Sequence, residues 1–411
     1  MPEDLVDSSS PECRILIYSH DSFGLGHLRR CREIAHSLVG SYERLSILIL
    51  SGSPIIGSFD FRSRVDFVRV PGVIKLRNGD YTSLSLHMDI EKTMELRGSI
   101  IQHTAEVFDP DIFLVDKEPL GLRGEVQDTL SILKKRGTRL ILGLRDVMDE
   151  AKLLVPEWER KNVMPALENL YDELWVYGLP QIYEPLEGIA LSASVRRKII
   201  YTGYLRYAVP DASATVPVTN ESYYLVTAGG GGDGEDLIDW VLRAYESDAT
   251  IPHRALIVFG PFMQNDEQEK FIERIEKLDN VDSIIFDSHI EHLMKNAIGV
   301  IAMGGYNTFC EILSFNKPAL IIPRTKPRLE QHIRASRAQE LGLMSVLNDD
   351  GIRDTGSMIT ALRQLPQQRP PSDIVLPGLL DGLPNISRLV GRYLDKNRSH
   401  QESIDFATLI G

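Results

Sequence analysis

The chain has 411 residues, enough for two or three domains of ordinary size. Hydrophobic residues make up 43% and charged residues 25%, which argues against wholesale disorder and fibrous repeats. The net charge of −13 argues against nucleic acid as a partner, three cysteines cannot form a disulfide framework, and no apolar run reaches the roughly 18 residues of a membrane span. The chain begins with an acidic, polar stretch that is not typical of a secretory signal, so we expect a cytoplasmic protein.

Short apolar runs alternate with longer amphipathic segments through the first half of the chain. The runs are apolar almost throughout, which is typical of parallel strands covered by helices on both faces. Strands are predicted at 14–19, 45–51, 65–70, 111–116, 138–145, 173–178 and 198–203, with helices at 27–39, 89–108, 122–136 and 158–171. This alternation predicts an open, doubly wound sheet with right-handed crossovers.

Residues 208–221 contain two prolines and small polar residues without periodicity, which indicates a linker. The alternation restarts after it. Strands are predicted at 223–228, 254–260, 281–286, 298–303 and 318–323, with helices at 234–246, 265–277, 305–315, 328–341 and 386–397. The sequence therefore predicts two similar α/β domains in tandem.

The turn after the first predicted strand carries two glycines and a histidine. It reads S-H-D-S-F-G-L-G-H over 19–27, and Gly24 and Gly26 let a ligand approach the backbone closely. A dinucleotide-binding turn would need a third glycine where Arg29 stands, and no acid ends the second strand, so nicotinamide binding is disfavoured. His27 falls at the helix start, where the helix dipole should keep its ring neutral and able to act as a general base. The alternative is a first-turn histidine bonded to a loop carbonyl.

Four consecutive glycines, 229–232, follow the first strand of the second half. Such a run costs backbone entropy and makes most sense where a ligand lies against bare backbone. Gly229, Gly231 and Gly234 satisfy G-x-G-x-x-G, but the next strand ends without the acid that holds a ribose in dinucleotide folds. We therefore predict a phosphate cradle, with a flexible surface loop as the alternative.

The segment 304–311 reads G-G-Y-N-T-F-C-E. Gly304 and Gly305 open a helix whose first-turn amides would face a phosphate, and Glu311 could accept both hydroxyls of a ribose. The same T-x-x-E spacing is also a capping box, with Thr308 as the N-cap, so both interpretations stay open.

Charged and amide side chains follow several other predicted strands. Glu330 and Gln331 start the helix after the strand at 318–323, where they suit sugar hydroxyls or simply form a solvated helix start. Asp116, Glu118, Arg145 and Asp146 end strands of the first half, and ligands of parallel sheets bind at such ends. These four residues could orient an acceptor, or a carboxylate among them could replace His27 as the base.

Several catalytic and metal motifs are missing from the sequence. It contains no P-loop, no H-E-x-x-H and no G-x-S-x-G. His289 and His292 could share one helix face, but two histidines alone are weak evidence for a metal site, and the D-P-D at 109–111 is ordinary turn chemistry. We therefore predict no metal.

Together, the G-x-G-H turn, the glycine run, G-G-x-x-T-x-x-E and the later E-Q pair resemble the GT-B glycosyltransferases, and within them family 28. The resemblance spans 14–345 and is most specific over 298–341. The pattern is similar to that of the N-acetylglucosaminyltransferase that makes the lipid-linked peptidoglycan precursor, but two turns differ. The usual G-G-T-G-G-H is here S-F-G-L-G-H, and G-G-S-Q-G is here G-G-G-G. The whole chain is more similar to a group of predicted bacterial glycosyltransferases.

The resemblance implies a GT-B fold, with two Rossmann-like domains whose parallel sheets face an interdomain cleft. The acceptor domain would span 12–207 and the nucleotide-sugar donor domain 222–365. A C-terminal helix at 384–397 would cross back to the first domain.

The resemblance also implies a role for each matching position. Glu311 would bind the ribose of a UDP-sugar, backbone at Phe286 and Asp287 would read the uracil edge, and Glu330 and Gln331 would contact the sugar. The diphosphate would lie against Gly230, Gly231, Gly305, Asn307, Thr308 and Arg206, the last with its register shifted by one residue. His27, Gly24, Gly26, Glu118 and Arg145 would lie on the acceptor side.

The implied activity is an inverting, metal-independent transfer of a hexose or N-acetylhexosamine from a UDP-sugar, with no cofactor besides this co-substrate. The acceptor would be a glycan, a lipid-linked molecule or a small molecule, and contact of residues 73–77 with lipid headgroups at the inner face of the cell membrane is left open. The alternatives are a nucleotide-sugar hydrolase or epimerase of the same fold, and a non-catalytic nucleotide-sugar-binding protein.

Overall fold

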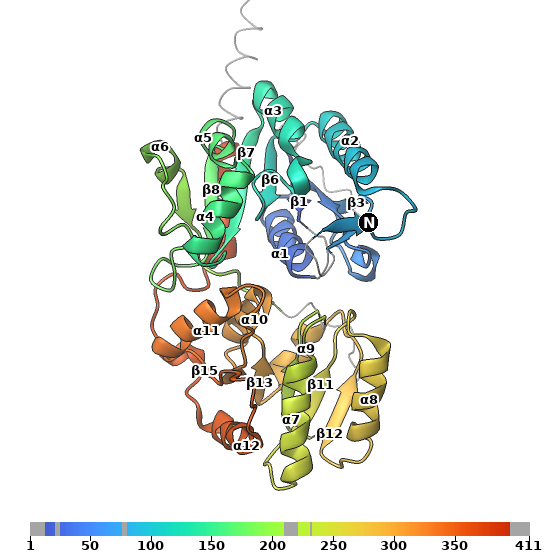
Figure 1. The fold of residues 1–411 in the computed structure, drawn as a ribbon. Helices are drawn as coiled ribbons and strands as arrows, with labels where there is room; N and C mark the ends of the chain where they lie inside the picture. Colours follow the sequence, from blue (N-terminus) through green and yellow to red (C-terminus); the bar gives the residue numbers. More distant parts are fainter. Residues whose placement is uncertain (1–12, 21–24, 76–79, 209–220, 231, 395–411) are drawn as a thin grey trace, which may run out of the picture.

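The structure is a computed structural model that describes residues 13–20, 25–75, 80–208, 221–230 and 232–394, and Figure 1 shows them in two lobes. The N-terminal lobe, blue to green in Figure 1, contains a seven-stranded parallel sheet in the order β3-β2-β1-β6-β7-β8-β9. Its strands are β1 (Cys13–Ser19), β2 (Leu45–Ser51), β3 (Val65–Arg69), β6 (Ile112–Asp116), β7 (Arg139–Arg145), β8 (Glu173–Tyr177) and β9 (Ile199–Tyr201). A short antiparallel hairpin, β4 (Val73–Lys75) with β5 (Tyr81–Ser83), lies outside this sheet.

The second lobe repeats the plan with a six-stranded parallel sheet in the order β12-β11-β10-β13-β14-β15. Its strands are β10 (Tyr223–Thr227), β11 (Arg254–Val258), β12 (Val281–Ile284), β13 (Gly299–Ala302), β14 (Ala319–Ile321) and β15 (Ser345–Val346). Strand order and parallel register in both sheets are those of Rossmann-like folds, as predicted.

Helices connect the strands in both lobes. Those of the first lobe are α1 (Gly26–Ser41), α2 (Ile90–Phe108), α3 (Gln127–Arg136), α4 (Ala151–Arg160), α5 (Met164–Asn169) and α6 (Ala193–Arg196). Those of the second lobe are α7 (Glu235–Ser247), α8 (Asn265–Ile275), α9 (Ile290–Asn296), α10 (Tyr306–Ser314), α11 (Glu330–Glu340) and α12 (Thr355–Gln364). Short 3₁₀ turns lie at 56–58, 122–124, 365–367 and 371–373.

Two predicted helices differ from the observed ones. The single helix expected over 158–171 is the pair α4 and α5, because Asn162 between them has a φ of 50° and Pro165 lies in the first turn of the second helix. The helix expected from residue 122 begins only at Gln127, since Arg123 has a φ of 50° and breaks the first turn. The β4–β5 hairpin, α6, α9, α12 and β15 were also not predicted from the sequence.

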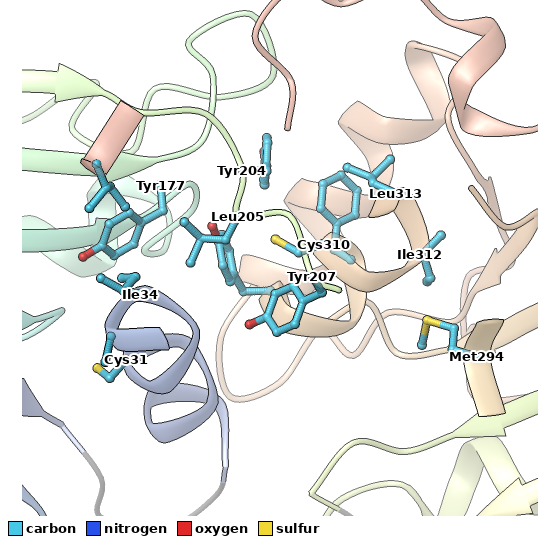
Figure 2. Packing of buried hydrophobic residues seen from close by; sticks show 14 of the residues in the cluster. Cys31, Ile34, Tyr177, Tyr204, Leu205, Tyr207, Met294, Cys310, Ile312 and Leu313 are labelled. Atoms are coloured by element: carbon cyan, nitrogen blue, oxygen red, sulfur yellow. The ribbon is translucent and has the colours of Figure 1, made fainter. Parts of the chain in front are cut away.

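One apolar core cluster continues across the boundary between the lobes. Figure 2 shows Tyr204, Leu205 and Tyr207, from the segment after β9, between Ile34 on α1 and Cys310 on α10. All five side chains are buried. This packing fixes how the start of α1 faces the start of α10, and that determines the geometry of the cleft.

Residues 382–394 form a last helix whose contacts lie on the first lobe. The Tyr42 hydroxyl donates to the backbone carbonyl of Ser387 at 2.8 Å, and the Arg139 guanidinium carbon lies 4.6 Å from the ring centroid of Tyr393. Residue 12, the segment 209–220 and residues beyond 394 lie outside the described residues, so the predicted domain limits and the full extent of this helix stay predictions.

Candidate functional site

A cavity of about 930 Å³ lies between the two lobes, at the carboxyl ends of both sheets. Most of the residues singled out from the sequence line it. From the first lobe these are Gly26, His27, Glu118 and Arg145, and from the second Gly230, Phe286, Asp287, Gly305, Asn307, Thr308, Glu311, Glu330 and Gln331.

Three predicted residues do not line the cavity. Asp116 and Asp146 are buried away from it, and Arg206 is exposed. Gly24 and Gly231 fall outside the described residues. The structure therefore gives no contact that supports Arg206 as a phosphate ligand.

His27 and Asp116 form a hydrogen-bonded pair, 89 positions apart in sequence. In the first sheet, β1 and β6 are neighbours where the strand order reverses, so the helix after β1 and the carboxyl end of β6 meet. Asp116 Oδ2 accepts from His27 Nδ1, and Arg30, one turn along α1, donates to both Asp116 oxygens at 2.7–2.9 Å. His27 lines the cavity, so its other nitrogen, Nε2, is the one available to a ligand.

Charge and burial set the protonation of this pair. Burial lowers the pKa of His27, against the opposing effect of Asp116, so the ring is neutral at pH 7. Burial alone would raise the pKa of Asp116, but Arg30 and His27 hold it well below its usual range. The ring is neutral as predicted, although burial rather than the helix dipole is the largest cause. The carboxylate fixes the Nδ1–H tautomer and leaves a lone pair on Nε2.

Backbone forms much of the cavity wall on the second lobe. Gly229 and Gly304 have φ values of 68° and 75°, which L side chains rarely adopt, and they turn the chain between strand and helix. Helix α10 begins at Tyr306, with Gly305 as an N-cap that supplies no side-chain hydrogen bond. Thr308 therefore lies inside the first turn, and the capping-box interpretation is wrong. First-turn amides at such a helix start suit an anion.

Glu311 is 1% exposed and meets a cation from the other lobe. Arg29 on α1 donates to Glu311 Oε1, and also to Glu291 Oε1 at 2.8 Å. Burial raises the pKa of Glu311 to about 8, with Glu291 and Glu33 acting in the same direction against Arg29. The residue predicted to bind ribose is thus linked directly to the helix that carries His27.

Glu330 and Gln331 start α11 as predicted, and both are buried. Arg145 donates to Glu330 Oε2 at 2.5 Å, and Gln331 Oε1 accepts from the Arg324 amide at 3.2 Å. Burial opposes ionisation of Glu330, but Arg145 and Lys117 outweigh it and lower its pKa to about 2. Glu330 is therefore an ionised hydrogen-bond acceptor inside the cavity.

The sequence analysis did not find several charged residues of the cavity. Arg29 and Arg30 follow His27 in G-H-L-R-R, and Lys117 stands between Asp116 and Glu118, so sequence adjacency to a candidate was the available signal. Among the described residues, no group of three or more His, Cys, Asp or Glu side chains is placed to hold a metal ion. Within the same part of the chain, no helix has the length and apolar character to cross a membrane.

Comparison with known proteins agrees with this geometry. Residues 225–367 match the glycosyltransferase family 28 C-terminal domain. No curated protein matches the chain by sequence. The specific resemblance to the peptidoglycan-precursor enzyme finds no support in these matches.

Solved structures of glycosyltransferases share the fold over nearly the whole chain. TcCGT1 in complex with UDP has a TM-score of 0.63 at 14% identity, covering 94% of this chain and 100% of its own. UGT2 of Phytolacca americana, complexed with UDP-2fluoro-glucose and pterostilbene, has a TM-score of 0.59 at 13% identity, covering 95% and 99%. The calicheamicin glycosyltransferase CalG4 has a TM-score of 0.58 at 14% identity, covering 93% and 98%. These matches confirm the GT-B fold, and the family match identifies residues 225–367 as similar to the C-terminal domain of family 28 glycosyltransferases.

Proposed function

We propose that this protein is a family 28-like GT-B glycosyltransferase that moves a hexose or N-acetylhexosamine from a UDP-sugar to an acceptor hydroxyl, without a metal and with inversion at the anomeric carbon. One observation carries the proposal. The His27–Asp116 pair of the first lobe and the glycine turns and Glu311 of the second lobe meet in a single cavity. A base and an anion cradle across one cleft are what a single displacement on a nucleotide sugar requires.

Donor binding follows from the second lobe. The diphosphate lies against the glycine turn at Gly230 and the first-turn amides of α10, Glu311 accepts from the ribose, and Glu330 faces the sugar. Two proteins of the same fold hold UDP or a UDP-sugar derivative, which supports uridine diphosphate as the carrier.

The electrostatics of the cavity favour an anionic donor. The whole chain has a net charge of −13, yet eight basic and six acidic side chains line the cavity. A cleft of opposite sign to the rest of the surface focuses field lines and concentrates anions.

The chemical step uses His27. Its neutral Nε2 takes the proton of the acceptor hydroxyl while that oxygen attacks the anomeric carbon on the face opposite the diphosphate. The bond from this carbon to the diphosphate oxygen breaks, UDP leaves, and Asp116 stabilises the imidazolium that forms. Backbone amides at α10 and the glycine turn meet the developing charge of the diphosphate. One displacement inverts the configuration.

The test is UDP release from a panel of UDP-sugars, with and without acceptor extract. Release that depends on the extract supports the transferase, and release without acceptor shows a hydrolase. UDP binding without any release shows a binding protein. His27→Ala is the negative control for turnover, and it should bind UDP like the unmodified protein because the nucleotide contacts lie in the other lobe.

A further inference from the structure

Two cations stand side by side in the first-lobe wall of the cavity. Lys117 follows Asp116 at the end of β6, and Arg145 ends the neighbouring strand β7. Lys117 has a φ of 66°, and its amide donates to the Gly143 carbonyl at 2.7 Å. This strained backbone position persists because the strand ends hold it, and such strain collects at functional sites.

The carboxylates near Lys117 are largely paired with another cation, Lys161. Lys161 donates to Glu118 at 2.7 Å and to Glu157 at 2.6 Å, whereas the ion pair of Lys117 with Glu118 spans 4.0 Å. Arg145 donates to Glu330 through one terminal nitrogen, and its Nε is buried without a hydrogen-bond partner among the described residues. Lys117 and Arg145 therefore keep donor capacity that the protein itself does not use.

Both side chains are mostly out of water, with exposures of 14% for Lys117 and 11% for Arg145. Burial and the nearby Arg145 lower the pKa of Lys117 to about 8, against the opposing effect of Glu118 and Glu330. Two close, poorly solvated positive charges repel each other, and an anion between them would relieve that cost.

We propose that Lys117 and Arg145 bind an anionic group, a carboxylate or a phosphate monoester, carried by the sugar of the donor or by the acceptor. This inference rests on the proposed function and names the substrate class. The pair interacts with Glu330, which the proposed function assigns to the sugar, and not with the glycine turns and α10 start that it assigns to the diphosphate. The group is therefore a charge additional to the diphosphate.

The experiment measures dissociation constants in two arms. In the donor arm, UDP-glucuronate is compared with UDP-glucose, and UDP alone is titrated as a reference. In the acceptor arm, glucuronate and glucose 6-phosphate are compared with methyl glucoside, on protein saturated with UDP and again without UDP. The variants are Lys117→Met and Arg145→Gln, with Lys152→Met as the control, because Lys152 is 72% exposed and lies outside the cavity lining.

We expect the anionic ligand to bind about tenfold more tightly than its neutral counterpart in one arm, the scale of a hydrogen bond to a charged group. The arm that shows the preference identifies whether donor or acceptor carries the charge. Lys117→Met and Arg145→Gln should each abolish the preference, and Lys152→Met should keep it. Lys117→Arg should also keep it, so an unstable Lys117→Met protein would not prevent the test.

Three results would overturn this inference: no anion preference in either arm, a preference that survives both substitutions, or an equal loss of affinity for UDP alone in Lys117→Met. The last result would assign the pair to the diphosphate. Failure of the unmodified protein to bind UDP would instead contradict the proposed function, and the acceptor arm without UDP would still report on the pair.

Discussion

The two walls of the cavity differ in what they present to a ligand. On the second lobe, backbone forms much of the wall, at the glycine turns and the first turn of α10. On the first lobe the wall consists more of side chains, among them His27 at a helix start and Lys117 and Arg145 at the ends of strands. The backbone amides of the second lobe suit a diphosphate. The side chains of the first lobe can be substituted to suit one acceptor without changing the fold.

Direct contacts between charged residues also join the two walls. Arg29 reaches Glu311 and Glu291 from α1, and Arg334 on α11 binds both oxygens of Asp146 at 2.6 and 2.7 Å. Both partners of the second pair are fully buried, whereas Arg29 and Glu311 line the cavity. The buried pair therefore joins the lobes away from solvent, and the Arg29–Glu311 pair joins them at the cavity.

The largest expected effect separates catalysis on one wall from binding on the other. His27→Ala should lower turnover by about 10²–10⁴-fold, because the general base is lost, with little change in the dissociation constant of UDP. The measurement is steady-state UDP release beside UDP titration of both proteins. If His27→Ala stays largely active and Asp116→Asn does not, the carboxylate is the base.

The pH profile gives a second check on His27. A general base must be unprotonated, and burial lowers the pKa of His27 below 6.5. The rate should therefore be insensitive to this group above about pH 6.5 and fall only as the pH drops through its lowered pKa. A rate that still rises between about pH 7 and 8 in both the unmodified protein and His27→Ala would point to another group.

The next effect concerns the buried Arg334–Asp146 ion pair between the lobes. Asp146→Asn leaves Arg334 as a buried guanidinium without a charged partner, and such losses cost about 3–5 kcal/mol of stability. Denaturant unfolding measures this directly. The matched control is Asp248→Asn, which removes a partner of the half-exposed Arg363 and should destabilise the protein much less, because water screens exposed ion pairs. An equal loss of unfolding free energy in both variants would show that the buried Arg334–Asp146 pair does not stabilise the contact between the lobes.

A smaller effect is expected on the donor wall. At about pH 8.5, where Glu311 is mostly ionised, Glu311→Ala should weaken UDP binding by about 2 kcal/mol, the scale of charge-assisted hydrogen bonds to the ribose. The substitution removes no helix cap, because α10 begins at Tyr306. Glu291→Ala is the matched control, since Glu291 shares Arg29 but does not line the cavity. Unchanged UDP affinity in Glu311→Ala would show that the ribose binds elsewhere.

The smallest effect is the pH dependence of that same contact. Burial raises the pKa of Glu311 to about 8, so ionisation increases as the pH rises towards that value. A carboxylate accepts from both ribose hydroxyls, whereas the protonated form has to donate one hydrogen bond. UDP affinity should therefore rise several-fold between about pH 6 and 8.5. In Glu311→Gln the rise should disappear, and a rise that persists would assign it to another group.

The sequence was most informative where function depends on local backbone. The glycine turns, G-G-x-x-T-x-x-E and the E-Q pair are short and contiguous, so they could be recognised without knowing the fold. The same segments line the cavity in the structure. The choice between capping and ligand binding at Thr308 could not be made from spacing, because it depends on where the helix starts, and the structure starts it at Tyr306.

Apolar runs and their alternation with amphipathic segments determined the two parallel sheets and the doubly wound fold, because burial on both faces leaves a pattern in each strand by itself. Contacts between distant segments leave no such local pattern. That His27 bonds to Asp116, that Arg29 reaches Glu311 and that Lys117 stands beside Arg145 was decided by strand order and by the packing of one lobe on the other. Two candidate bases in the sequence thus became one hydrogen-bonded pair, because the switch point of the first sheet brings the start of α1 to the end of β6.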